Sequence, residues 1–235
     1  MDKYFDISYV WGAFPQLLPF LKITFLFVFI STIIGLVIGF MITWLKLSSV
    51  KAFQWFANTY ITILRCTPSI VLLFLVYYGI PQIGKVFAFN LNDIPTIYFV
   101  ITAFSLQFGA VMAEVIRASY LSIDRGQFEA GLSAGMHPVT VLIRIIVPQA
   151  IVSALPNFAN SFISLLQEGA LAYTIGFIDV VGKAELIIAS NYNTHALEIY
   201  IALALIYWIL SILIEHLFKW IEEKANKSSL QRRSA

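Results

Sequence analysis

The feature that most constrains this chain is a series of long apolar stretches, the first of which contains no charged residue between positions 23 and 45. A helix needs about 20 mostly apolar residues to cross a bilayer. Five stretches reach that length, at about residues 20–45, 57–80, 94–118, 152–178 and 196–218. Only 12% of the residues are charged, against roughly a quarter in soluble domains. Because backbone groups in lipid must bond within the segment, the sequence predicts an all-α integral membrane protein with five transmembrane helices.

Positive charges are distributed unevenly among the segments that join these stretches, and cytoplasmic segments of membrane proteins are rich in Lys and Arg. With the N-terminus outside, the cytoplasmic set is Lys46, Lys51, Arg117, Arg125, Arg144, Lys219, Lys224, Lys227, Arg232 and Arg233, with Arg65 near the same face. The outer set is Lys3, Lys22, Lys85 and Lys183. The sequence therefore predicts an outer N-terminus, an inner C-terminus, a cytoplasmic segment at 119–148 and a short solvated tail at 219–235.

The predicted cytoplasmic segment is polar and rich in small residues. Residues 127–134 predict a helix of about two turns, with Phe128 and Leu132 four positions apart on one apolar face. Small residues such as Gly131 would let another backbone approach closely, and Pro138 is expected to end the helix. Two interpretations fit this pattern: another protein grips the helix, or the segment is a connector that lies on the lipid headgroups.

The spacing within this segment resembles a cytoplasmic motif of the binding-protein-dependent ABC importer permeases. That motif is Glu-Ala-Ala, three residues, Gly, nine residues, Ile, one residue, Leu and Pro. The corresponding residues here are Glu129-Ala130-Gly131, Gly135, Ile145 and Val147-Pro148. The resemblance implies the type I permease fold, with a transmembrane domain at 17–218, and a contact between this segment and an ATPase subunit.

Flanking residues are similar to those of the polar amino-acid permeases, which include histidine, glutamate, glutamine, arginine and cystine types. That subfamily has Arg-Gly-Thr-Pro where this chain has Arg-Cys-Thr-Pro at 65–68, and it has a Tyr-Tyr-Gly-Leu-Pro stretch where this chain has Tyr-Tyr-Gly-Ile-Pro at 77–81. One departure is Gln-Glu-Gly-Ala-Leu at 167–171, where many relatives have Lys-Asp-Thr-Ser-Leu. If that region touches substrate, its charge preference differs from that of those relatives.

The resemblance implies the permease subunit of an ATP-driven amino-acid importer, with cystine as the narrower expectation. The chain has no Gly-x4-Gly-Lys-Ser/Thr phosphate loop, so two copies of a separate ATPase subunit are expected to use ATP and Mg²⁺, and this chain to bind no cofactor or metal. Further expected partners are a second permease copy or a paralogue, an extracytoplasmic amino-acid-binding protein and membrane lipid, but no nucleic acid. The expected location is the cytoplasmic membrane of a prokaryote, as a multi-pass protein. An alternative is a stand-alone ion-coupled carrier or channel; no cluster of His, Cys or paired carboxylates favours an enzyme.

Three groups of candidate site residues follow. The expected ATPase-coupling residues are Gln127, Glu129, Ala130, Gly131, Gly135 and Pro148. We expect Gly135 to bend the segment and Glu129 to anchor the short helix by hydrogen bonds. The candidates for the substrate path are polar residues within or near apolar stretches, since such residues are costly in lipid: Gln107, Asn160, Gln167 and Glu168. The gate or interface candidates are Arg65, Pro68, Glu114 and Arg117.

Two of these groups have more than one interpretation. Glu168 is the best-placed anion for the ammonium group of an amino acid, but an ion pair or a helix end near the outer interface explains it equally well. A broken helix at Pro156 and Gly169 would fit either role. Glu114 and Arg117 are three positions apart and predict an intrahelical pair or a loop anchor rather than substrate ligands.

Overall fold

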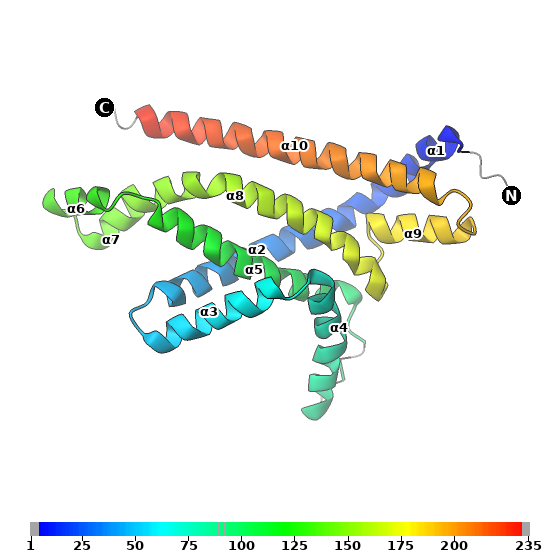
Figure 1. Cartoon of the computed structure of the whole chain (residues 1–235), viewed down its shortest axis with the longest axis horizontal. Coiled ribbons are helices and arrows are strands. Elements are labelled where there is room, and N and C mark those ends of the chain that lie inside the picture. Colours follow the sequence, from blue (N-terminus) through cyan, green and yellow to red (C-terminus); the bar gives the residue numbers. More distant parts are fainter. Residues whose placement is uncertain (1–4, 89, 92, 232–235) are drawn as a thin grey trace.

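The computed structural model describes residues 5–88, 90, 91 and 93–231, and every regular element in these ranges is a helix (Figure 1). In chain order they are α1 (Ile7–Leu17), η1 (Leu18–Phe20), α2 (Leu21–Leu47), α3 (Lys51–Cys66), α4 (Ser69–Val86), α5 (Thr96–Leu121), α6 (Arg125–Ser133), α7 (Pro138–Val141), η2 (Leu142–Ile146), α8 (Val147–Glu168), η3 (Gly169–Ile175), α9 (Val180–Ser190) and α10 (Ala196–Gln231). Five helical stretches are long and apolar enough to cross a membrane: Ile7–Leu47, Ser69–Val86, Thr96–Leu121, Pro138–Ile175 and Ala196–Ala225. The predicted all-α fold with five membrane helices is confirmed.

The closest helix pair is α2 with α5, which pack through glycines. A Cβ atom on Gly39 would lie 2.8 Å from the Cβ of Met112, and one on Gly109 would lie 2.6 Å from a methyl carbon of Ile38. Gly35 faces Phe108 in the same way, with 2.8 Å to its ring. Small residues bring membrane helices into van der Waals contact where no hydrophobic force between them is available. We call this interface the α2–α5 seam.

The second predicted stretch, 57–80, is not a single helix. Thr67 and Pro68 have extended backbone, with ψ angles of 124° and 140°, and α4 leaves α3 at a steep angle (Figure 1). The physical reason is local, because a proline disfavours helical geometry in the residue before it and cannot donate a helical hydrogen bond. Of the two helices α3 and α4, only α4 is long and apolar enough to be a candidate span.

The fourth predicted stretch, 152–178, begins earlier than expected. The helical run starts at Pro138 and passes through η2, a π-helical turn, into α8. Pro148 has no backbone N–H for the carbonyl of Arg144, which favours the wider turn at this point. The α-helix continues through Pro156 without a break and changes at Gly169 to the 3₁₀ turns of η3. The expected break therefore exists at Gly169 but not at Pro156.

The two ends of the molecule differ. At one end lie α1 and α9, and at the other lie α6, α7 and the end of α10 (Figure 1). The first and last helices therefore end on opposite sides, as an odd number of spans requires. The carboxylate of Asp179, which is fully buried, accepts hydrogen bonds from Thr24 and from the backbone N–H groups of Val181 and Gly182, so it joins α9 to α2.

The C-terminal part of the chain is helical, and the solvated end expected at 219–235 stays a prediction. Helix α10 is 36 residues long, or about 54 Å at 1.5 Å per residue, whereas the hydrocarbon layer is about 30 Å thick. It extends as helix through most of 219–235. Three of the charged residues used to predict the orientation lie outside the described residues: Lys3, Arg232 and Arg233.

Candidate functional site

The first part of the site is the segment of α6, α7 and η2, which we call the coupling segment. Asp124 starts α6 by accepting a hydrogen bond from the N–H of Gly126 at 2.8 Å. Gly135 ends the helix, with φ +81° and with the N–H of Met136 bonded to the carbonyl of Gly131 at 3.1 Å. This is a Schellman cap, which needs a left-handed residue such as glycine. The predicted stop at Pro138 is wrong; Gly135 turns the chain, and Pro138 begins α7.

The motif spacing has a structural reason in this segment. Gly131 on α6 is buried against the next turn of chain, where a Cβ atom would lie 2.8 and 2.9 Å from the Cγ atoms of Val141 and 3.4 Å from the Cδ1 of Ile145. Gly131 and Ile145 are both motif positions, and they meet because the chain reverses at Gly135. A different number of residues between them would place another side chain opposite Gly131.

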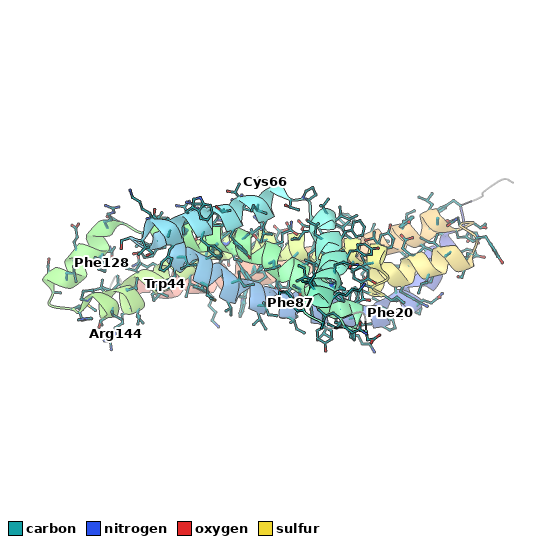
Figure 2. All side chains as sticks on the ribbon, turned by 90° about the horizontal axis from the view of Figure 1, so that it is seen from below. Phe20, Trp44, Cys66, Phe87, Phe128 and Arg144 are labelled. Atoms are coloured by element: carbon teal, nitrogen blue, oxygen red, sulfur yellow. The ribbon has the colours of Figure 1, made fainter. Side chains whose placement is uncertain are left out.

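The remaining face of α6 is open. Gln127, Glu129 and Ala130 are exposed, and Phe128 is half-buried at the tip of the molecule (Figure 2). The expected anchoring by Glu129 is not seen in the described residues, where its carboxylate has no hydrogen-bond partner and only its carbonyl accepts the Ser133 hydroxyl at 3.0 Å. The exposed carboxylate is thus available to a partner on this face.

The second part of the site is a polar face on α8. Polar residues recur there every three or four positions, which places them on one side of a helix: Gln149, Ser153, Asn157, Asn160, Ser161, Ser164 and Glu168. The opposite side, with Phe162, Leu165 and Leu166, is buried in the apolar core. The outward-facing side of this membrane helix is therefore polar, and such residues face a water-filled cavity or another protein rather than lipid.

At the end of this polar face lies a pocket of about 230 Å³ between α5 and α8. Its lining includes Gln107, Asn160 and Glu168, with Phe104, Phe108, Val111, Ser161, Ser164 and Leu165. Three of the four predicted path residues are thus brought together. Gln167 is not among the lining residues; it is exposed and reaches Ser211 on α10 at 3.4 Å.

Hydrogen bonds join three helices at this pocket. The Gln107 side-chain amide donates to the Ser69 hydroxyl at 2.9 Å, and that hydroxyl donates to the Glu168 carboxylate at 2.7 Å. The amide oxygen of Gln107 is buried and accepts no hydrogen bond from the described residues. The hollow is lined by Gln107 and Glu168, and no cationic side chain is among its described lining residues.

Sequence reasoning missed Ser69, Ser161 and Ser164. Serine gives little signal alone because it is common in membrane helices. The spacing of three and four from Asn157 to Glu168 was the available signal. Ser69 had no comparable signal, because its contact with Glu168 is 99 residues away in the chain.

Among the gate or interface candidates, Arg65 lies elsewhere than predicted. It is the exposed penultimate residue of α3, beside Cys66 and far from the end that bears α6 (Figure 2). The 16 residues of α3 span about 24 Å from its first residue, Lys51. Pro68 follows at the break between α3 and α4, so both residues lie near Ser69 rather than near the end of the molecule that bears α6.

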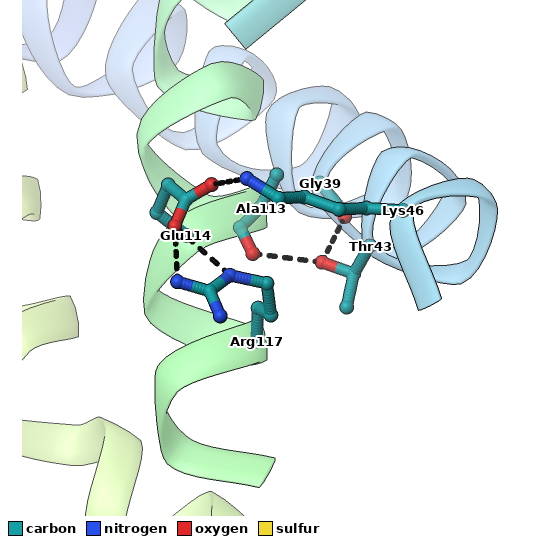
Figure 3. Close-up of polar contacts among 6 residues, drawn as sticks. All are labelled: Gly39, Thr43, Lys46, Ala113, Glu114 and Arg117. Atoms are coloured by element: carbon teal, nitrogen blue, oxygen red, sulfur yellow. Dashed lines mark hydrogen bonds and ion pairs between the residues drawn. The ribbon is translucent and has the colours of Figure 1, made fainter. Parts of the chain in front are cut away.

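Glu114 and Arg117 form the expected intrahelical pair, at 2.9 Å between Nη2 and a carboxylate oxygen. The other carboxylate oxygen binds Lys46, so the cluster also joins α5 to α2 (Figure 3). One turn away, the Thr43 hydroxyl lies 2.9 Å from the Ala113 carbonyl and 2.8 Å from that of Gly39. These contacts extend the α2–α5 seam with polar bonds, and the cluster lies outside the pocket lining.

Together these features define a class of protein: a helical membrane protein with a polar face along one membrane helix and a small exposed helix at one end. The family described as "Binding-protein-dependent transport system inner membrane component" matches residues 32–227. The chain belongs to this family of ABC importer permeases.

Similar proteins agree with this assignment. The chain is 33% identical to the L-cystine transport system permease protein TcyL of Bacillus subtilis, over 97% of this chain and 95% of the relative. It is 34% identical to the probable amino-acid ABC transporter permease protein PatM of Vibrio harveyi, over 95% and 98%. A crystal structure of an amino acid ABC transporter with histidines has TM-score 0.83 and 32% identity, covering 94% of this chain and 99% of that one. The family resemblance predicted from the motifs is confirmed.

Proposed function

We propose that this chain is the permease subunit of an ATP-driven amino-acid importer in the cytoplasmic membrane of a prokaryote. The observation that carries the proposal is the polar face of α8, which runs from the coupling segment to the pocket at Glu168. A substrate would move along this face, and a separate ATPase subunit would drive the movement by binding α6. Relatives named for cystine and amino-acid transport support this function.

The partners follow from the surfaces. A polar helix face cannot lie in lipid at acceptable free energy, so a second permease copy or a paralogue would cover it and complete the path. The exposed face of α6 would take one of two ATPase subunits, and the end with α1 and α9 would meet the extracytoplasmic binding protein. In this orientation α6 is cytoplasmic and the N-terminus is outside, as the charge distribution predicts.

The pocket chemistry favours one class of substrate. The carboxylate of Glu168, which lines the pocket, is an acceptor for an ammonium group. No described lining residue is cationic, so a substrate with net negative charge would find no counter-ion. We expect zwitterionic or cationic amino acids, with L-cystine as the first to test because of the relative named for it. Many relatives have Lys at the position of Gln167. This difference would affect the charge of the bound substrate less than the sequence implied, because Gln167 is not among the pocket lining residues.

The experiment is uptake in a strain that lacks the chain, complemented with the wild type or with variants and supplied with labelled amino acids. ATP-dependent uptake is expected only when the ATPase subunit is present. Glu168→Gln should lower uptake by about 10- to 100-fold, because hydrogen bonds to charged groups contribute about 1.5–3 kcal/mol. The control is Gln167→Ala, one position away. It should lower uptake less than threefold, because it removes only a hydrogen bond between two neutral groups. Uptake that persists without the ATPase would favour the stand-alone carrier or channel.

A further inference from the structure

Helix α6 is attached more firmly to the elements that lead into α8 than to α5, the membrane helix that precedes it. Helix α6 packs against α7 and η2, where Gly131 lies on Val141, a side chain with 0% exposure. No packing of similar extent joins α6 to α5 in the described residues. The link to α5 is the short turn through Ser122 and Asp124, and the Ser122 hydroxyl lies 3.1 Å from that of Ser153 on α8.

The elements that α6 touches, α7 and η2, continue directly into α8, which bears the polar face. Residues Pro138–Ile175 form one helical run, so a displacement of α7 displaces the start of α8 as well. The π-helical turn lies within this run, and the Gln149 side-chain amide bonds the Ile145 carbonyl there at 2.8 Å. At its other end, α8 finishes at Glu168, which lines the pocket.

We propose that Gly131 and Val141 are a matched pair of positioning residues that transmits movement of α6 to α8 rather than to α5. The fit leaves no room for a Cβ atom at Gly131, because both Cγ atoms of Val141 would lie within 3.0 Å of it. Valine cannot easily turn away, since its χ1 angle is strongly restricted in a helix. The pair therefore sets the distance between α6 and the start of α8. This inference rests on the proposed function, in which a separate ATPase moves α6.

The test uses the complete transporter, with its ATPase and permease partners, in proteoliposomes. The measurements are ATP hydrolysis, uptake, and the amount of ATPase that copurifies. Gly131→Ala should lower the uptake per ATP hydrolysed by about tenfold, with ATPase association kept, since overpacking shifts the backbone. Val141→Ala alone should give a smaller loss. Gly131→Ala with Val141→Ala should restore the ratio to within about twofold of wild type, since the added methyl then occupies space vacated by the Cγ atoms.

The control is Gly12→Ala in α1, where a Cβ atom would meet nothing within 4 Å, and it should leave all three measurements unchanged. Unchanged coupling in Gly131→Ala would overturn the inference, as would a double variant no better than the single one. Loss of ATPase association in Gly131→Ala would also overturn it, because Gly131 would then serve only the docking surface. If the wild-type complex shows no ATP-dependent uptake, it is the proposed function that fails, which keeps the two failures distinct.

Discussion

Helix α5 has two faces that differ in how they pack. Toward α2 it meets glycines at distances that admit no further carbon atom, and hydrogen bonds and ion pairs extend the contact. Toward α8 it encloses a pocket of about 230 Å³ with polar walls. Close-packed interfaces transmit movement as a unit, whereas an interface with a polar hollow can repack at lower cost. We therefore expect α2 and α5 to behave as one rigid unit, and α8 to shift more easily relative to them.

The largest effect is expected at the α2–α5 seam. Gly39→Leu would place a side chain where even a Cβ lies 2.8 Å from Met112 and 3.2 Å from the backbone N of Ala113. Backbone cannot yield as a flexible side chain can, so we expect a loss of ~3 kcal/mol or more in stability. The measurement is the amount of folded protein in the membrane and its thermal unfolding in detergent. A folded, stable Gly39→Leu would show that the seam is not fixed.

The ion-pair cluster at the end of the seam should give an intermediate effect. Glu114→Gln leaves both Lys46 and Arg117 without their carboxylate, whereas Lys46→Met leaves the Glu114–Arg117 pair intact. We expect Glu114→Gln to lower the free energy of unfolding by ~2 kcal/mol and Lys46→Met by about half of that, because unpaired charges are costly where water is scarce.

Thermal unfolding of the two single variants and the double variant would check this order. The double variant should be no worse than Glu114→Gln, since the two residues act through one contact. Equal or greater damage from Lys46→Met would contradict the arrangement in which one carboxylate bridges two cations (Figure 3).

The smallest effect is expected on the α8 side of α5. Ser69→Ala removes the hydroxyl that joins Gln107 to Glu168 without opening the seam. We expect the KM for uptake to rise by about 3- to 10-fold, because the variant loses about 1 kcal/mol of hydrogen bonding in the pocket. The unfolding temperature should change little.

The control for Ser69→Ala is Ser190→Ala, since that hydroxyl bonds a carbonyl of its own helix, Ile187, at 2.8 Å. It should alter neither KM nor stability. If Ser69→Ala lowered stability as much as Gly39→Leu, Ser69 would stabilise the fold rather than the pocket. The two faces of α5 would then pack alike.

Local rules explain what could be predicted. The number of candidate spans, the small helix after Asp124 and the intrahelical pair of Glu114 with Arg117 depend on neighbours within a few positions, and the structure contains them. The division at Pro68 is also local and could have been read from its geometry. The predicted helix at 127–134 ends within one residue of α6, but its stop signal was misjudged: a glycine with positive φ competes with a nearby proline, and here Gly135 comes first.

The sequence by itself determined that this chain is a helical membrane protein of the permease class. Apolar length and motif spacing decide that, because lipid forces backbone bonds inward and because the reversal at Gly135 fixes which residues meet. Only the tertiary structure decided that Ser69, Gln107 and Glu168 form one cluster, that Gln167 lies outside it and that Lys46 shares Glu114 with Arg117. Such contacts join residues tens of positions apart, so they depend on how whole helices pack.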